Sequence, residues 1–121
     1  MRRAWLPFLA FGYAGLIFYL SSRSSFPVAL PSFDAADKAA HLLEYAGLGV
    51  LVAWSLGSYG VPRSRALWLA AAACSLYGAS DEVHQLFVPG REGDLFDWLA
   101  DSAGGAIGAA AWFWASRKEG Q

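Results

Sequence analysis

The segment AWLPFLAFGYAGLIFYL, from Ala4 to Leu20, contains no charged residue. Its length is close to the roughly 20 residues that a helix needs to cross the hydrocarbon core of a membrane. A helix on the surface of a soluble core would carry a polar stripe along one face, and this segment has none. No small-residue cleavage pattern follows it, so we expect a retained membrane helix rather than a signal peptide.

Three more apolar runs follow, and each is short for a membrane span. Each continues on one side only into a polar segment that is compatible with a helix. Pro27, Pro31, Pro62 and Pro89 fall between the runs and predict breaks. We therefore predict an all-α single domain, an integral membrane four-helix bundle over residues 1–121, with helices at about residues 4–21, 37–58, 66–88 and 94–116.

The distribution of basic residues predicts the orientation of this bundle. One side holds more Lys and Arg than the other, and the richer side is expected to be cytoplasmic. Both termini and the Pro62 loop then lie in the cytoplasm, and the polar ends of the last three helices meet at the external face. The richer side holds Arg2, Arg3, Arg63, Arg65, Arg117 and Lys118, and the other side holds Arg23, Lys38 and Arg91.

Composition excludes some classes of protein. The net charge is only -1, so the chain has no basic surface for nucleic acid. Cys74 is the single cysteine, which rules out a disulfide within the chain. Gly104 and Gly108 have the spacing that allows two membrane helices to pack closely.

The polar segments place ionisable residues on common helix faces. His41 shares one face with Glu44 and an overlapping face with Lys38 and Tyr45. Ionisable groups inside a spanning helix cost roughly 2.5 to 3.5 kcal/mol at its centre, so they normally face the bundle interior. The later helices add Asp81, Glu82, His84 and Gln85, and then Asp97 and Asp101.

Several chemistries fit these residues. The histidines and carboxylates could bind a divalent metal, although no typical metal-binding spacing is present. They could act as general base and acid on a lipid-linked substrate, or form a proton or ion relay. A fourth reading is a polar cluster that only locks the bundle. Cofactor, metal and oligomeric state are left open by the sequence.

Two motifs carry a resemblance to a known family. The first is Asp37-Lys38-x-x-His41-x-x-Glu44-Tyr45-x-x-Leu48. The second is Asp81-Glu82-x-His84-Gln85-x-Phe87-x-Pro89-Gly90-Arg91, continued by Asp97-Trp98. The chain resembles the VanZ-like family of small bacterial membrane proteins, named for an accessory protein of teicoplanin resistance. Asp101 departs from the pattern, because such proteins often have Asn at that position.

The resemblance implies a multi-pass protein of the bacterial inner or plasma membrane. Our leading hypothesis is an external-face site that binds or modifies a lipid headgroup or cell-wall precursor, with an effect on glycopeptide susceptibility. The alternatives are a small ion- or proton-coupled transporter and a non-catalytic envelope protein. The expected partners are membrane lipids and a lipid-linked or cell-wall precursor. The predicted catalytic residues are His41, Glu44, Asp81 and His84, and the predicted substrate-binding residues are Lys38, Tyr45, Gln85, Arg91 and Asp97.

Overall fold

The computed structural model describes residues 3–22, 35–89 and 95–117, without the side chains of residues 35–37. These residues form four α-helices and no strand, which confirms the predicted all-α fold. The helices are α1 (Trp5–Ser21), α2 (Ala35–Ser58), α3 (Arg63–Gln85) and α4 (Leu95–Ser116).

The bounds of α3 differ most from those predicted: the helix begins and ends three residues before the predicted bounds of 66 and 88. Pro62 precedes its first turn, and the Pro62 carbonyl accepts the Ala66 amide at 2.8 Å. Pro has no N–H to lose at a helix start, so the helix can begin directly after it. After Gln85 the amides of the next three residues reach back only three residues, which tightens the chain before Pro89.

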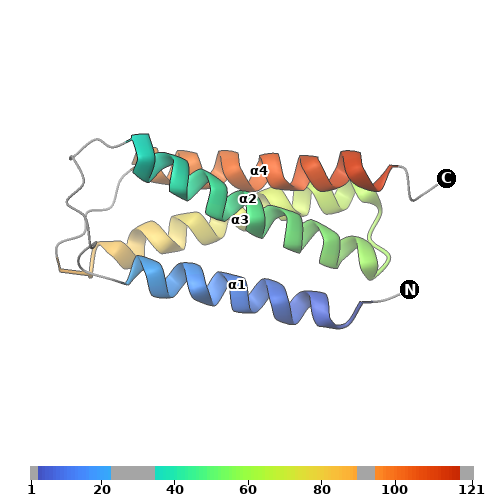
Figure 1. The fold of residues 1–121 in the computed structure, drawn as a ribbon, viewed down its shortest axis with the longest axis horizontal. Coiled ribbons are helices and arrows are strands. Elements are labelled where there is room, and N and C mark those ends of the chain that lie inside the picture. The colour runs from blue at the N-terminus through green and yellow to red at the C-terminus, as the bar shows by residue number, and fades with distance from the viewer. Residues whose placement is uncertain (1–2, 23–34, 90–94, 118–121) are drawn as a thin grey trace.

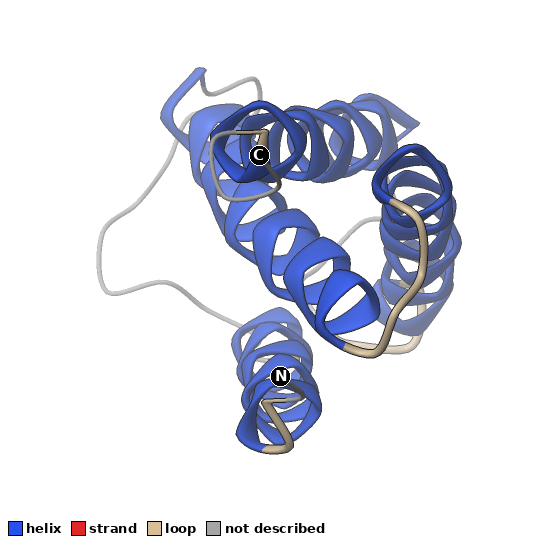
Figure 2. Cartoon of the chain, turned by 90° about the vertical axis from the view of Figure 1, so that its right-hand side faces the viewer, coloured by secondary structure: helices blue, strands red, loops and turns tan. Residues whose placement is uncertain are grey.

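Two parallel pairs of helices make the bundle. α2 and α4 run in one direction, and α1 and α3 run in the other (Figure 1). α2 packs most extensively on α4 and also contacts α1 and α3. α1 contacts α2 and, less extensively, α3, and it lies away from α4 (Figure 2). α1 is therefore the peripheral helix.

Glycines set the close approach of α2 and α4. A methyl group at Gly108 would overlap the Ala46 carbonyl, and one at Gly104 would overlap the Leu42 carbonyl. In the other direction, a methyl group at Gly49 would overlap the Gly105 carbonyl. The Gly104–Gly108 spacing is thus used for packing, in agreement with its sequence pattern.

The start of α1, the end of α4 and the turn between α2 and α3 lie at one end of the bundle, which we call the basic end (Figure 1). Here the Arg63 guanidinium donates to Ser116 Oγ at 2.9 Å and to the Phe113 carbonyl near the end of α4. Arg3 and Arg117 lie over the rings of Trp54 and Trp114. A cation at a helix C-terminus is favourable because carbonyl groups remain unpaired there.

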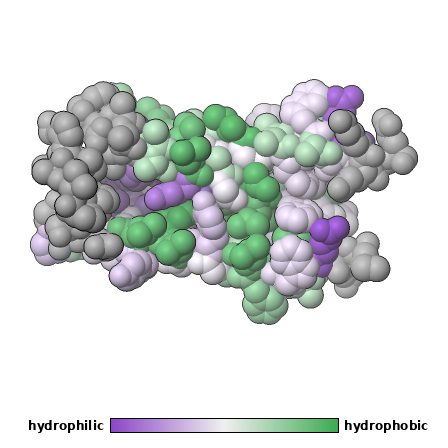
Figure 3. All heavy atoms as spheres, in the orientation of Figure 1, coloured by the Kyte–Doolittle hydropathy of each residue, from purple (hydrophilic) through white to green (hydrophobic). Residues whose placement is uncertain are grey.

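The outer surface is strongly apolar. Large hydrophobic side chains are exposed on all four helices, and hydrophobic residues cover much of the middle of the face seen in Figure 3. Among the described residues, one helix, Lys38–Ser58, is both long and apolar enough to cross a membrane. α1 is also apolar but has 17 residues.

Candidate functional site

The buried polar side chains of the described residues gather at the end of the bundle opposite the basic end. They come from all four helices, because α1 and α3 end there and α2 and α4 begin there (Figure 1). We call this group, with the partly buried side chains that contact it, the polar cluster. It consists of Ser21, Ser22, Lys38, His41, Asp81, Glu82, His84, Gln85, Asp97 and Asp101.

One half of the polar cluster joins α2 to α4. Lys38 Nζ donates to Asp97 Oδ1 at 2.6 Å, and one turn further His41 Nδ1 lies 2.8 Å from Asp101 Oδ1. His41 Nε2 is 3.9 Å from Asp97 Oδ2. An ionised Asp101 can only accept, so Nδ1 of His41 donates to it and Nε2 faces Asp97. The parallel register set by the glycines brings these pairs together.

The other half joins α1 to α3. Ser21 Oγ donates to Asp81 Oδ1 at 2.5 Å and accepts from Gln85 Nε2 at 3.0 Å. Ser22 Oγ donates to the Phe18 carbonyl, so it accepts from Nε2 of His84, which is 2.9 Å away. These bonds fix the Ser–Asp–Gln group and the tautomer of His84.

The His84 ring also stacks on Phe18, with 4.3 Å between the ring centroids. His84 therefore contacts α1, whereas His41 contacts α4.

Glu82 and Tyr45 lie between the two halves. Glu82 offers a carboxylate oxygen within 4.8 Å of ligand atoms of His41 and Asp97, and likewise of Asp81 and Asp101. Tyr45 is fully buried, and its hydroxyl lies in the field of the Asp101 and Asp81 carboxylates. The cluster is therefore continuous through the interior.

The structure brings together most of the residues that the sequence predicts for the site. Glu44 is the exception: it is half-buried on the side of α2 that faces α1, where its carbonyl accepts the Tyr13 hydroxyl at 2.7 Å. The carboxylate of Asp101, on α4, hydrogen-bonds His41. Arg91 lies outside the described residues.

Four members of the polar cluster were not assigned a role from the sequence: Ser21, Ser22, Glu82 and Asp101. Asp101 was noted only for sharing a helix face with Asp97 and for its departure from the family pattern. Ser21 and Ser22 follow the last apolar residue of the first helix. This position, at the polar end of the predicted bundle, is the sequence feature that could have indicated their place in the site. Glu82 was noted only as a neighbour of Asp81. Its importance depends on the packing of α3 against both α2 and α4, which helix periodicity within α3 does not reveal.

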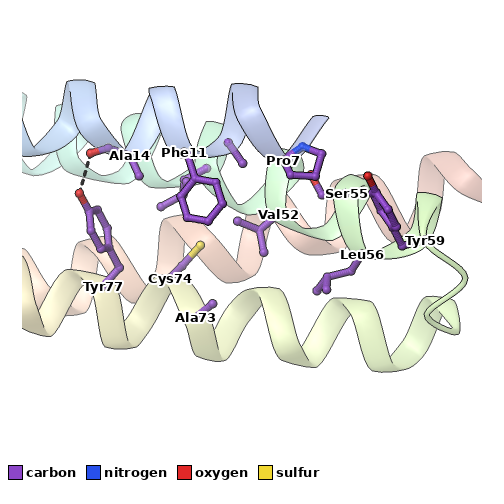
Figure 4. Close-up of a pocket in the computed structure, with 12 residues that line it drawn as sticks. Pro7, Phe11, Ala14, Val52, Ser55, Leu56, Tyr59, Ala73, Cys74 and Tyr77 are labelled. Carbon is purple, nitrogen blue, oxygen red and sulfur yellow. Dashed lines mark hydrogen bonds between the residues drawn. The ribbon is translucent and has the colours of Figure 1, made fainter. Parts of the chain in front are cut away.

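An apolar groove lies beside the polar cluster, between α1, α2 and α3. It has a volume of about 490 Å³ and is lined almost wholly by apolar atoms. Figure 4 shows it running from Tyr77, whose hydroxyl donates to the Ala14 carbonyl at 2.6 Å, to Tyr59 near the basic end. Phe11, Val52 and Cys74 line its middle. The Tyr77 ring packs near that of Tyr45, so the groove approaches the polar cluster there.

Fold and site together define a class: a small helical bundle with an interior polar site at one end and an apolar groove alongside it. Residues 5–116 match the VanZ/LLP1 family model, and the chain belongs to this family. The match covers nearly the whole chain and confirms the resemblance carried by the two motifs. Neither a curated protein nor a solved structure shows significant similarity to the chain.

Proposed function

We propose that the chain is a multi-pass protein of the bacterial cell membrane, with the basic end in the cytoplasm and the polar cluster at the external face. α2, α3 and α4 have 22 to 24 residues. At 1.5 Å per residue these helices are about 33 to 36 Å long, enough for a hydrocarbon core of about 30 Å. The exposed apolar belt and the Arg and Trp side chains at the basic end support the same placement.

This topology predicts which loops an impermeant thiol reagent can reach. In a Cys74→Ala background, Glu92→Cys should be labelled in intact cells and Ser64→Cys only after the cells are opened. Cys74 is the single cysteine of the chain and is fully buried. Its replacement by Ala therefore removes the only other thiol and leaves the surface of the protein unchanged. Labelling of Ser64→Cys but not Glu92→Cys in intact cells would contradict the orientation.

For the site, we propose that the polar cluster binds or modifies the headgroup of a lipid or of a lipid-linked cell-wall precursor. The observation that carries this proposal is the adjacency of the cluster and the apolar groove through Tyr45 and Tyr77. A molecule with a polar head and a long apolar tail matches both surfaces at once. Sugars and peptides without a tail would leave the groove unused.

The contacts support chemical roles for members of the cluster. His41, held by Asp101, presents Nε2 to accept a proton. His84 donates its Nε2 proton to Ser22, which leaves its Nδ1 for proton exchange. Lys38, and Arg91 from the sequence motif, supply positive charge for an anionic headgroup. By acting on such a precursor, the protein affects susceptibility to glycopeptides such as teicoplanin.

A structural role is the second candidate, and specific contacts favour it. The bonds of Ser21 with Asp81 and Gln85 tie α1 to α3, and the pairs of Lys38 and His41 tie α2 to α4. A transporter is less well supported, because the described buried side chains beyond Tyr45 toward the basic end are apolar. They are Leu6, Leu48, Ala53, Ala66, Ala70, Cys74 and Ala109.

Retention of lipid tests the proposed function. We expect the protein purified in mild detergent to carry a co-purified lipid or precursor, detected by native mass spectrometry and identified after extraction. Asp81→Asn keeps the shape of the side chain but removes its charge beside Ser21, and should reduce the retained lipid by about tenfold, equivalent to about 1.4 kcal/mol. Teicoplanin susceptibility of cells that express each variant is the second readout.

The matched control is Glu44→Gln, the same change from acid to amide at a carboxylate outside the polar cluster. It should retain lipid as the wild type does. If Asp81→Asn lowers the melting temperature while lipid retention is unchanged, the cluster is a structural lock. A wild-type protein that carries no lipid would contradict the proposed function.

A further inference from the structure

We propose that the polar cluster contains a divalent-cation site in which Asp81, Glu82 and Asp101 are the protein ligands. This inference goes beyond the proposed function, because the site is complete without a lipid. One carboxylate oxygen from each of the three residues lies within 4.8 Å of the other two. Carboxylate ligands lie about 2.0 to 2.6 Å from Mg²⁺ or Ca²⁺, so small side-chain rotations suffice to bring all three onto one ion.

Two buried polar atoms point independently to a missing ligand. Asp101 is 0% exposed, and its Oδ2 has no hydrogen-bond partner among the described residues. The Tyr45 hydroxyl, also in a side chain with 0% exposure, has no partner among them either. Because buried polar groups in folded proteins are nearly always satisfied, two such atoms beside one carboxylate cluster need an explanation.

The direction of Asp101 fits this explanation. Its Oδ1 is taken by His41, and its Oδ2 lies against α3, 3.2 Å from the position of a methyl group built on Gly78. Gly78 is one helical turn before Asp81 and Glu82, so the unpartnered oxygen faces the helix that carries the other two ligands. The absence of a side chain at Gly78 leaves room for Asp101.

A second set of candidate ligands adjoins the first and shares Glu82 with it: His41, Glu82 and Asp97. Lys38 already supplies a positive charge to Asp97 at 2.6 Å, so we assign the cation to the set with Asp81 and Asp101. In this assignment His41 is not a ligand of the cation. Its bond to Asp101 orients the ligand, as outer partners commonly do in metal sites.

The experiment uses Mn²⁺ as the probe, because oxygen ligands suit Mg²⁺, Ca²⁺ and Mn²⁺ and free Mn²⁺ is measured directly by electron paramagnetic resonance. Full-length protein in mild detergent is freed of metal with EDTA and titrated with MnCl₂. We expect saturable binding and a rise in melting temperature with Mn²⁺. Glu82→Gln and Asp101→Asn should each weaken binding by about tenfold or more.

The matched control is Glu44→Gln, which should bind Mn²⁺ as the wild type does. Circular dichroism checks folding, and if Asp101→Asn fails to fold, Glu82→Gln decides the result because Glu82 is only partly buried. Binding by the wild type that Glu82→Gln leaves unchanged would overturn the site, as would no binding of Mn²⁺, Mg²⁺ or Ca²⁺. Lipid retention measured on the same samples separates this outcome from failure of the proposed function.

Discussion

Gly108→Val should separate α2 from α4 and lower the free energy of unfolding by about 3 kcal/mol, the upper range for overpacked interiors. A first methyl group at Gly108 already overlaps the Ala46 carbonyl, and this obstacle is main chain. Main chain cannot rotate aside as a flexible side chain can, so the helices must move. Thermal unfolding in mild detergent, followed by circular dichroism and size exclusion, measures the loss.

Gly15→Val is the matched control for this prediction. A methyl group at Gly15 meets nothing within 4 Å, and the glycine lies in a helix as Gly108 does. Its stability should be unchanged or slightly raised, since Gly is among the poorest helix formers. Equal tolerance of Val at both positions would show that α2 and α4 are not held in the close contact described above.

The second large effect concerns the buried pair of His41 and Asp101. Asp101→Asn and His41→Gln should each destabilise the protein, because each replaces the buried bond between an imidazole and a carboxylate by a weaker or less well-aligned bond to an amide. A double-mutant cycle should give a coupling energy of about 2 kcal/mol, within the range for residues in direct contact. The measurements are made in EDTA, so that loss of a bound cation does not add to the effect.

The pair of Ser22 and His84 provides the comparison. This pair also joins a side-chain oxygen to an imidazole nitrogen: Ser22 Oγ and His84 Nε2 are 2.9 Å apart. Unlike His41 and Asp101, however, both residues are partly exposed. Water can replace that bond when either partner is removed, so its coupling should be below about 0.5 kcal/mol. A coupling for His41 and Asp101 as small as this would mean that Asp101 does not hold the imidazole.

Much of the fold followed from local features of the sequence. The uncharged runs predicted four helices, and Pro62 predicted the turn between the second and third. The three- and four-residue spacings correctly placed Lys38 with His41, and Asp97 with Asp101, on common faces. These features depend only on the geometry of one helix at a time, which the sequence expresses directly.

The partner of His41 could not be predicted in this way. Glu44 shares a helix face with His41, whereas Asp101 is 60 positions away and contacts it only because α4 lies parallel to α2 in one register. That register depends on where the glycines let two backbones meet. The periodicity of a single helix contains no information about the register between two helices. For the same reason, the sequence did not predict the central position of Glu82.

The order in which the helices can be buried during synthesis depends on how far apart the contacting residues are in the chain. Lys38 and His41 on α2 meet carboxylates that are 59 and 60 positions later, on α4. If the helices cross a membrane as proposed above, α1 can enter the bilayer alone because it carries no charge, whereas the polar start of α2 meets its partners only after α4 has been translated. In the proposed membrane setting, the ionisable end of the newborn chain therefore stays hydrated until its last helix arrives, and it is the final part of the molecule to close.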